Sequence, residues 1–197
     1  MTLAKAKRYA MSLVDWLAPY CERIEIAGSI ARERPVCNDV DLVCISKVEE
    51  SRDLFGNVVS WKPLLHEFLR EYVEKSLGRS KWIHGGGQYN LFLQLPKCQL
   101  DIWCTQQSNW GSVLICRTGS KEHNIWLAQR AERLGTKWDP YRGVSGTPAT
   151  TEAEVYAALG LPWITPKERE MPGLAQKFDR TTRDHKTTDQ GTKGPRD

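Results

Sequence analysis

Two aspartates, Asp39 and Asp41, are separated by a single valine in the segment Asn38-Asp39-Val40-Asp41. If this segment is a strand, alternate residues point to the same face, and the two carboxylates lie a few ångström apart. Like charges at that distance repel each other unless a cation neutralises them. Mg²⁺ prefers carboxylate oxygens together with substrate phosphates, so the spacing indicates metal-dependent chemistry on a phosphorylated substrate. An isolated Asp-x-Asp pair is also typical of a solvated strand end.

A third acid, Asp101, lies between the apolar residues Leu100 and Ile102, where an unpaired charge is costly. Three acids that converge can hold two metal ions about 3.5–4 Å apart. One ion then activates the attacking oxygen, and the other stabilises the leaving phosphate. Taken alone, Asp101 could instead pair with a lysine at the edge of a sheet.

The pair Gly28-Ser29 would supply the complementary half of such a site. Glycine lets the backbone approach a ligand closely, and the start of the following helix offers free N–H groups to a phosphate. Arg32, one turn later, can add a charge-assisted hydrogen bond to the same phosphate. A Gly-Ser pair alone is a weak signal. The order of Gly-Ser turn, short helix, Asp-x-Asp strand and later strand with one acid favours the functional interpretation.

The elements that would position these residues alternate along the first 105 residues. Apolar residues at helical spacing predict two helices, and alternating patterns broken by glycine and proline predict strands. The helices cover residues 3–17 and 61–77, a helical turn covers 30–33, and the strands cover 22–27, 39–45, 81–84, 89–95 and 98–104, with a hairpin turn at Gly85-Gly86-Gly87. Residues 46–60 are polar and are expected to loop over the surface.

The pattern becomes mostly helical after residue 105. Helices are predicted over residues 110–116, 123–134 and 151–159. The last of them begins with a capping box, in which Thr150 or Thr151 caps the helix and Glu154 completes the box. Residues 140–150 are rich in glycine, proline, serine and threonine and are expected to form a loop.

These elements predict an α+β fold with two lobes. The first lobe, over residues 1–105, has a mixed sheet with flanking helices, and a small, mostly helical lobe covers residues 106–172. Apolar residues nearly vanish afterwards, which predicts a disordered tail over residues 173–197.

Length and composition limit the class of protein. The chain has 197 residues, of which 40% are hydrophobic and 26% charged, which excludes a fibrous or wholly disordered protein. No apolar run is long enough to span a membrane and no signal-peptide core is present, so we expect a soluble, intracellular protein. Six cysteines without a C-x-x-C pair argue for free thiols and against a zinc site. The net charge of +4 is compatible with a polyanionic partner without establishing one.

Three segments together resemble a known family. The run Ala27-Gly28-Ser29-Ile30-Ala31-Arg32, followed by Asp39-Val40-Asp41, resembles the signature of the nucleotidyltransferase superfamily with the polymerase-β-like palm. Residues 117–124 (Arg-Thr-Gly-Ser-Lys-Glu-His-Asn) and 151–170 are similar to segments of family X DNA polymerases. The resemblance spans about residues 5–172 and implies a palm followed by a C-terminal subdomain that binds nucleotide and DNA.

The resemblance implies a role for each matching residue. Asp39, Asp41 and Asp101 would be catalytic and would bind two Mg²⁺ ions, which Mn²⁺ could replace. Asp101 would also help to deprotonate the primer 3′-hydroxyl. The incoming nucleotide would be bound by Gly28, Ser29 and Arg32 at the triphosphate, Asn38 through its backbone N–H, Gly119 at the sugar and Asn124 at the minor-groove edge of the base.

Contacts with the DNA backbone would come from Lys121, Arg130 and Arg133, although the pattern of each favours an ordinary solvated charge. The segment Thr118-Gly119-Ser120 is equally compatible with a helix cap, and Asn124 with an exposed helix position.

The sequence also departs from the family pattern. Cys116 and Arg117 stand where the family usually has two aromatic residues beside the sugar, so we predict weak discrimination between dNTPs and rNTPs. Trp103 stands two positions after Asp101, where the family often has a basic residue, and it could stack on a base. Only 27 residues precede Gly28, so we expect a minimal polymerase without the lyase and helix-hairpin-helix domains.

The function expected from the resemblance is that of a monomeric DNA-directed DNA polymerase of the family X type. It would add dNMP to a primer 3′-hydroxyl by two-metal phosphoryl transfer and would fill short gaps in DNA repair, with DNA and dNTP as partners. Two alternatives stay open: a transferase with the same palm that acts on RNA or a small molecule, and an inactive palm that binds nucleic acid. Template-dependent incorporation separates the first from a polymerase, and metal-dependent activity excludes the second.

Overall fold

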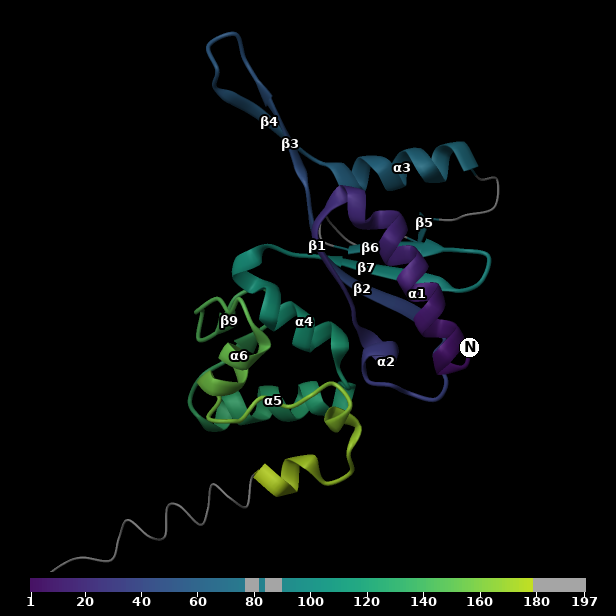
Figure 1. Cartoon of the computed structure of the whole chain (residues 1–197). Coiled ribbons are helices and arrows are strands. Elements are labelled where there is room, and N and C mark those ends of the chain that lie inside the picture. The colour runs from purple at the N-terminus through teal and green to yellow at the C-terminus, as the bar shows by residue number, and fades with distance from the viewer. Residues whose placement is uncertain (77–81, 84–89, 179–197) are drawn as a thin grey trace, which may run out of the picture.

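A five-stranded mixed sheet forms the centre of the N-terminal half (Figure 1). The computed structural model describes residues 1–76, 82–83 and 90–178. Within them the strand order is β1-β2-β7-β6-β5, and β2 and β7 are parallel whereas the other neighbours are antiparallel. The strands are β1 (Cys21–Ile26), β2 (Asp39–Ser46), β5 (Trp82–Ile83), β6 (Asn90–Gln94) and β7 (Gln99–Cys104). All five strands predicted from the sequence are present, and the turn expected at Gly85-Gly86-Gly87 lies outside the described residues.

Two long helices cover one face of this sheet (Figure 1). They are α1 (Leu3–Leu17), which the short helix η1 (Ala18–Tyr20) follows, and α3 (Leu64–Ser76). The apolar stripe of α1 packs with Leu65 and Leu69 of α3 against Val40, Leu42 and Cys44 of β2. Because side chains alternate along a strand, residues 39, 41 and 43 point to the opposite face.

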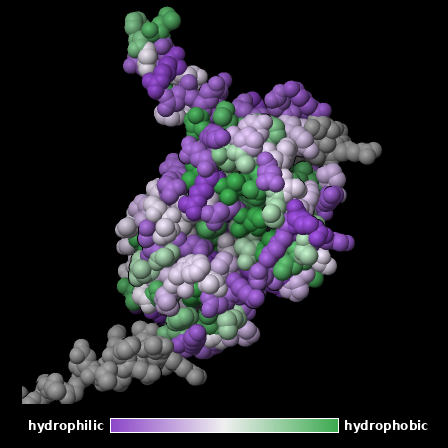
Figure 2. Space-filling view, viewed as in Figure 1, coloured by the Kyte–Doolittle hydropathy of each residue, from purple (hydrophilic) through white to green (hydrophobic). Residues whose placement is uncertain are grey.

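A hairpin projects from the end of β2 and contradicts the surface loop that we expected over residues 46–60 (Figure 1). It consists of β3 (Val48–Arg52) and β4 (Val58–Pro63). Asp53 shapes its turn, because its carboxylate accepts hydrogen bonds from the backbone N–H groups of Phe55 and Asn57. At the tip, Leu54 is 101% and Phe55 89% exposed, and Figure 2 shows this apolar tip on a polar stem.

The C-terminal part is mostly helical, as predicted, and has its own apolar core. Its helices are η2 (Gln107–Asn109), α4 (Trp110–Thr118), α5 (Lys121–Arg133), α6 (Glu152–Ala158) and η3 (Glu168–Glu170), and a small hairpin of β8 (Trp138–Asp139) and β9 (Gly143–Val144) joins α5 to α6. The predicted capping box is present, formed by Thr151 and Glu154. None of the helices within the described ranges has the length and apolar character needed to cross a bilayer.

Residues 174–178 form a helical turn, so the disorder predicted from residue 173 onward is wrong for this stretch. Leu174, Ala175 and Phe178 lie at helical spacing, and all three pack against the C-terminal core. The tail predicted over residues 179–197 lies outside the described residues.

Helix α4 joins the two parts. Its residues Trp110, Val113 and Leu114 pack with Ala27 and Val43 in a third apolar cluster. Val43 shares its face of β2 with Asp39 and Asp41, so α4 covers the Val43 end of this face. The acids therefore lie at the other end of the strand, beside the short helix α2 (Gly28–Ala31).

Candidate active site

The parallel pairing of β2 with β7 brings the predicted acids to one face of the sheet. Asp41 is the register partner of Asp101, and Asp39 is the register partner of Gln99. Register partners in a sheet point to the same side. Asp101 is 9% exposed, so its carboxylate is buried beside that of Asp41.

Both of the paired acids have raised pKa values. Burial, followed by the charge of Asp39, raises the pKa of Asp41 to about 6, although a hydrogen bond from Trp103 and the charge of Arg32 oppose this. Burial also raises the pKa of Asp101, against a hydrogen bond from Gln99. A divalent cation at this place would remove the repulsion.

Gly28 lies directly against Asp41. Its φ angle is +59°, and a Cβ atom added there would lie 1.9 Å from Oδ2 of Asp41, so a side chain at this position would displace the Asp41 carboxylate. The next residue, Ser29, has a buried hydroxyl without a hydrogen-bond partner. A buried hydroxyl normally has a partner, and a phosphate oxygen at the turn would supply one. This arrangement fits the predicted triphosphate site.

Arg32 follows at the end of α2, and its guanidinium is already bound within the protein. Nε donates to the carboxylate of Glu170 in η3, and Nη1 donates to the carbonyl oxygen of Thr118 at the end of α4. The structure therefore places Arg32 one helical turn from Ser29, where it ties α2 to the C-terminal part. Gly119 lies beneath it, since a Cβ added there would be 3.0 Å from Nη1 of Arg32.

The other predicted nucleotide ligands lie apart from this turn. Asn38 is exposed beside Asp39. The amide of Asn124 is engaged by the protein, because Nδ2 donates to the carbonyl oxygen of Cys116 at 2.7 Å. Ser120 caps α5 by accepting a hydrogen bond from the N–H of His123, so the helix cap left open by the sequence is present.

The predicted DNA contact at Arg130 is contradicted by its burial. Arg130 is 7% exposed, and its guanidinium donates to the carbonyl oxygens of Leu159 and Gly160 at 2.6 and 3.2 Å. The sequence pattern of a helix does not reveal that a basic side chain in it donates hydrogen bonds to the carbonyl oxygens at the end of another helix. Lys121 and Arg133 are exposed, and their contacts with DNA stay a prediction.

Two residues beside the acids were not assigned to the site from the sequence. Gln99 donates through Nε2 to Oδ1 of Asp101 at 2.7 Å, and Trp103 donates through Nε1 to Oδ1 of Asp41 at 3.3 Å. The signal was present in the strand pattern, because residues two before and two after Asp101 share its face.

The acids provide the ligand chemistry that a divalent cation prefers. The carboxylates of Asp41 and Asp101, from neighbouring strands, provide hard oxygen ligands. Separate hydrogen bonds, from Gln99 to Asp101 and from Trp103 to Asp41, orient the two carboxylates. Among residues 1–76, 82–83 and 90–178, no group of three acidic, histidine or cysteine side chains is arranged as a ready-made metal site. The structure thus brings Asp41 and Asp101 together and places Asp39 beside them on the same face.

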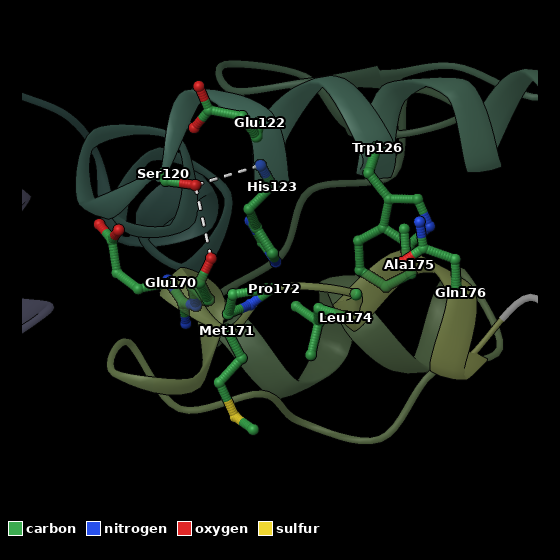
Figure 3. A pocket seen from close by; sticks show the side chains of 12 residues that line it. Ser120, Glu122, His123, Trp126, Glu170, Met171, Pro172, Leu174, Ala175 and Gln176 are labelled. Atoms are coloured by element: carbon green, nitrogen blue, oxygen red, sulfur yellow. Dashed lines mark hydrogen bonds between the residues drawn. The ribbon is translucent and has the colours of Figure 1, made fainter.

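A pocket of about 410 Å³ lies next to this region but does not include the acids. It is lined by the start of α5 and by residues 169–176. Figure 3 shows the hydroxyl of Ser120 between His123 and the chain at Arg169, which joins the two walls. Arg169 is fully buried and pairs with Glu152 at 2.9 Å, so this wall belongs to the C-terminal core.

Known proteins are similar to this chain in sequence and in fold. Residues 113–170 match the family described as DNA polymerase beta thumb. A solved ternary P/T complex of Leishmania infantum polymerase beta is similar in fold, with a TM-score of 0.61 and 19% identity over 87% of this chain and 77% of that chain. A ternary gap complex of the same protein gives 0.60 and 19% over 87% and 71%. None of the curated proteins compared with this chain matches it.

The sheet with its paired acids, followed by the helical part, defines a polymerase β-like fold of the α+β class. More particularly, its C-terminal part is similar to the thumb of polymerase beta, as the resemblance in sequence led us to expect. The segment that matches the thumb family begins within α4 and ends with η3.

Proposed function

We propose that this protein is a DNA-directed DNA polymerase of the family X type, which adds dNMP to the 3′-hydroxyl of a primer. The observation that carries the proposal is the register pairing of Asp41 with Asp101 beside the Gly28-Ser29 turn. The polymerase β-like fold and the thumb match support the same class of activity. The ternary complexes of the Leishmania infantum protein support DNA as the partner and short gaps as the substrate.

The chain's own residues would act by binding and orienting the reactants. Mg²⁺ held by Asp39, Asp41 and Asp101 would supply neutralisation of the charge on the transferred phosphoryl group. The hydroxyl of Ser29 would bind a phosphate oxygen. Asp101 would also help to deprotonate the primer 3′-hydroxyl.

The test is extension of a DNA substrate with a one-nucleotide gap. Each dNTP and each rNTP is offered singly with Mg²⁺ to the wild type, to Asp101→Asn and to Asp15→Asn. The last variant is a matched control, because Asp15 lies exposed on α1, which covers the opposite face of the sheet. We expect template-matched addition by the wild type and the control, and loss of at least about 100-fold in Asp101→Asn.

Two outcomes of this assay would redirect the assignment. Addition that ignores the template, or none on DNA while nucleotide still binds, would contradict a template-directed polymerase and favour another acceptor. The rNTP lanes test the weak sugar discrimination expected from Cys116 and Arg117. A strong preference for dNTPs would contradict that expectation alone.

A further inference from the structure

The indole of Trp103 contacts both Asp41 and Arg117 of α4. On β7 it points to the same face as Asp101, and its register partner on β2 is Val43. Its Nε1 donates a hydrogen bond of 3.3 Å to Oδ1 of Asp41. The other oxygen of that carboxylate, Oδ2, faces the backbone of Gly28. Asp41 is therefore held from two sides, with Oδ2 directed to the Gly28-Ser29 turn.

The indole ring is itself fixed by its neighbours. The guanidinium of Arg117, in the last turn of α4, lies 3.5 Å from the ring centroid, which is the geometry of a cation–π contact. Phe92 of β6 meets the ring edge-on, with centroids 5.2 Å apart. Arg117 in turn donates to the hydroxyl of Tyr141 at 3.4 Å. A ring held on its face and its edge has little freedom to turn its N–H away from Asp41.

We propose that Trp103 is a positioning residue for the Asp41 carboxylate, and that Arg117 acts on this carboxylate only by holding the indole. The inference rests on the proposed metal-dependent function, since it concerns how Asp41 is presented to a divalent cation. A group that hydrogen-bonds a metal ligand fixes its orientation, and loss of such a group typically weakens metal binding by about 10–100-fold.

The first experiment uses electron paramagnetic resonance to measure the binding of Mn²⁺ to the full chain in the absence of DNA and nucleotide. Trp103→Phe removes the N–H but keeps an aromatic ring for Arg117 and Phe92. Trp163→Phe is the matched control, because Nε1 of Trp163 also donates to a carboxylate, that of Glu152 at 3.0 Å, in the C-terminal part. We expect about tenfold weaker Mn²⁺ binding in Trp103→Phe and no change in the control.

The second experiment tests the role of Arg117 with Arg117→Met, which keeps a long apolar side chain over the ring. We expect binding of Mn²⁺ to weaken by a few-fold, as for the loss of a cation–π contact. The double variant Trp103→Phe/Arg117→Met is expected to bind no more weakly than Trp103→Phe alone, because Arg117 has no effect once the N–H is gone. Losses that multiply in the double variant would overturn the linkage.

Kinetics of gap filling give an independent reading. A misoriented Asp41 should lower kcat by about tenfold and leave KM for the nucleotide within about twofold, since the Ser29 turn is intact. Mn²⁺ affinity in Trp103→Phe equal to that of the wild type would overturn the inference. A different result would separate the two proposals: the wild type binds Mn²⁺ and Trp103→Phe binds it more weakly, but the wild type extends no primer. In that case the polymerase proposal fails and the positioning role of Trp103 stands.

Discussion

The carboxylate of Asp41 lies against Gly28 and beside Asp101, and it accepts a hydrogen bond from the indole N–H of Trp103. Its pKa is raised to about 6 in the folded protein from an ordinary value of 3.8, chiefly by burial. The folded state therefore binds a proton more tightly than the unfolded chain. The stability linked to this proton is fully present below about pH 4 and is lost as the pH rises through about 6.

Asp41→Asn should abolish the loss of stability between about pH 4 and pH 7, because the asparagine side chain does not titrate. In the presence of a chelator, the melting temperature of the variant should exceed that of the wild type at pH 7, and the difference should shrink at pH 4. Thermal unfolding followed by circular dichroism at both pH values measures it. A difference that is the same at pH 4 and pH 7 would contradict the raised pKa.

Gly28→Ala tests the close approach of the turn to Asp41. The substitution adds both an unfavourable positive φ and a clash with Oδ2. Gly135→Ala is the control, because Gly135 has a φ of +73° but no atom within 4 Å of an added Cβ. We expect Gly135→Ala to lower stability by about 1 kcal/mol, and Gly28→Ala to lose Mn²⁺ binding and gap filling as well. An active Gly28→Ala variant would show that the turn can move.

The hairpin of β3 and β4 is the element that the sequence predicted least well. Its strands have polar side chains on both faces, so no buried face imposes the alternation by which strands are recognised. In contrast, the Asp39–Ser46 strand was predicted within one residue, because α1 and α3 bury its alternate side chains. Its pairing with β7 was not predicted, since pairing depends on contacts far apart in the sequence.

The roles of Trp103 and Arg130 were missed for the same reason. A tryptophan in a strand and an arginine in a helix carry no local mark of the partner that they meet. Trp103 meets Asp41, and Arg130 meets the carbonyl oxygens at the end of α6.

The exposed tip of the hairpin should contribute nothing to the stability of the core. Leu54 and Phe55 are 101% and 89% exposed, so replacing both by serine should leave the free energy of unfolding within about 0.5 kcal/mol of the wild type. Leu65→Ala is the buried control, at 0% exposed, and should cost about 2–5 kcal/mol. Urea unfolding measures both. Marked destabilisation by the serine pair would mean that the tip folds back onto the protein.

Helix α4 and two ion pairs connect the N-terminal part of the molecule to its C-terminal part. Arg32 pairs with Glu170, and Glu33 pairs with Lys167 at 3.1 Å. These contacts join the segment around α2 to the C-terminal part without using Lys121 or Arg133.

Salt dependence of binding to gapped DNA tests which basic residues serve as phosphate contacts. Lys121→Ala and Arg133→Ala should each reduce the slope of log K against log salt by about 1, whereas Arg130→Ala should leave the slope unchanged and lower the melting temperature. Fluorescence anisotropy over a salt series provides the slopes. An altered slope in Arg130→Ala would mean that this buried side chain reaches DNA after all.

The strand order of the sheet has a consequence for synthesis on the ribosome. Of the five strands, β7 is made last, yet it lies in the middle, between β2 and β6. A nascent chain that has not yet released β7 therefore presents β2 with one open edge and Asp41 without its partner. Insertion of this single strand closes the sheet and brings Asp101 beside Asp41, so the acids meet only after translation has passed Cys104.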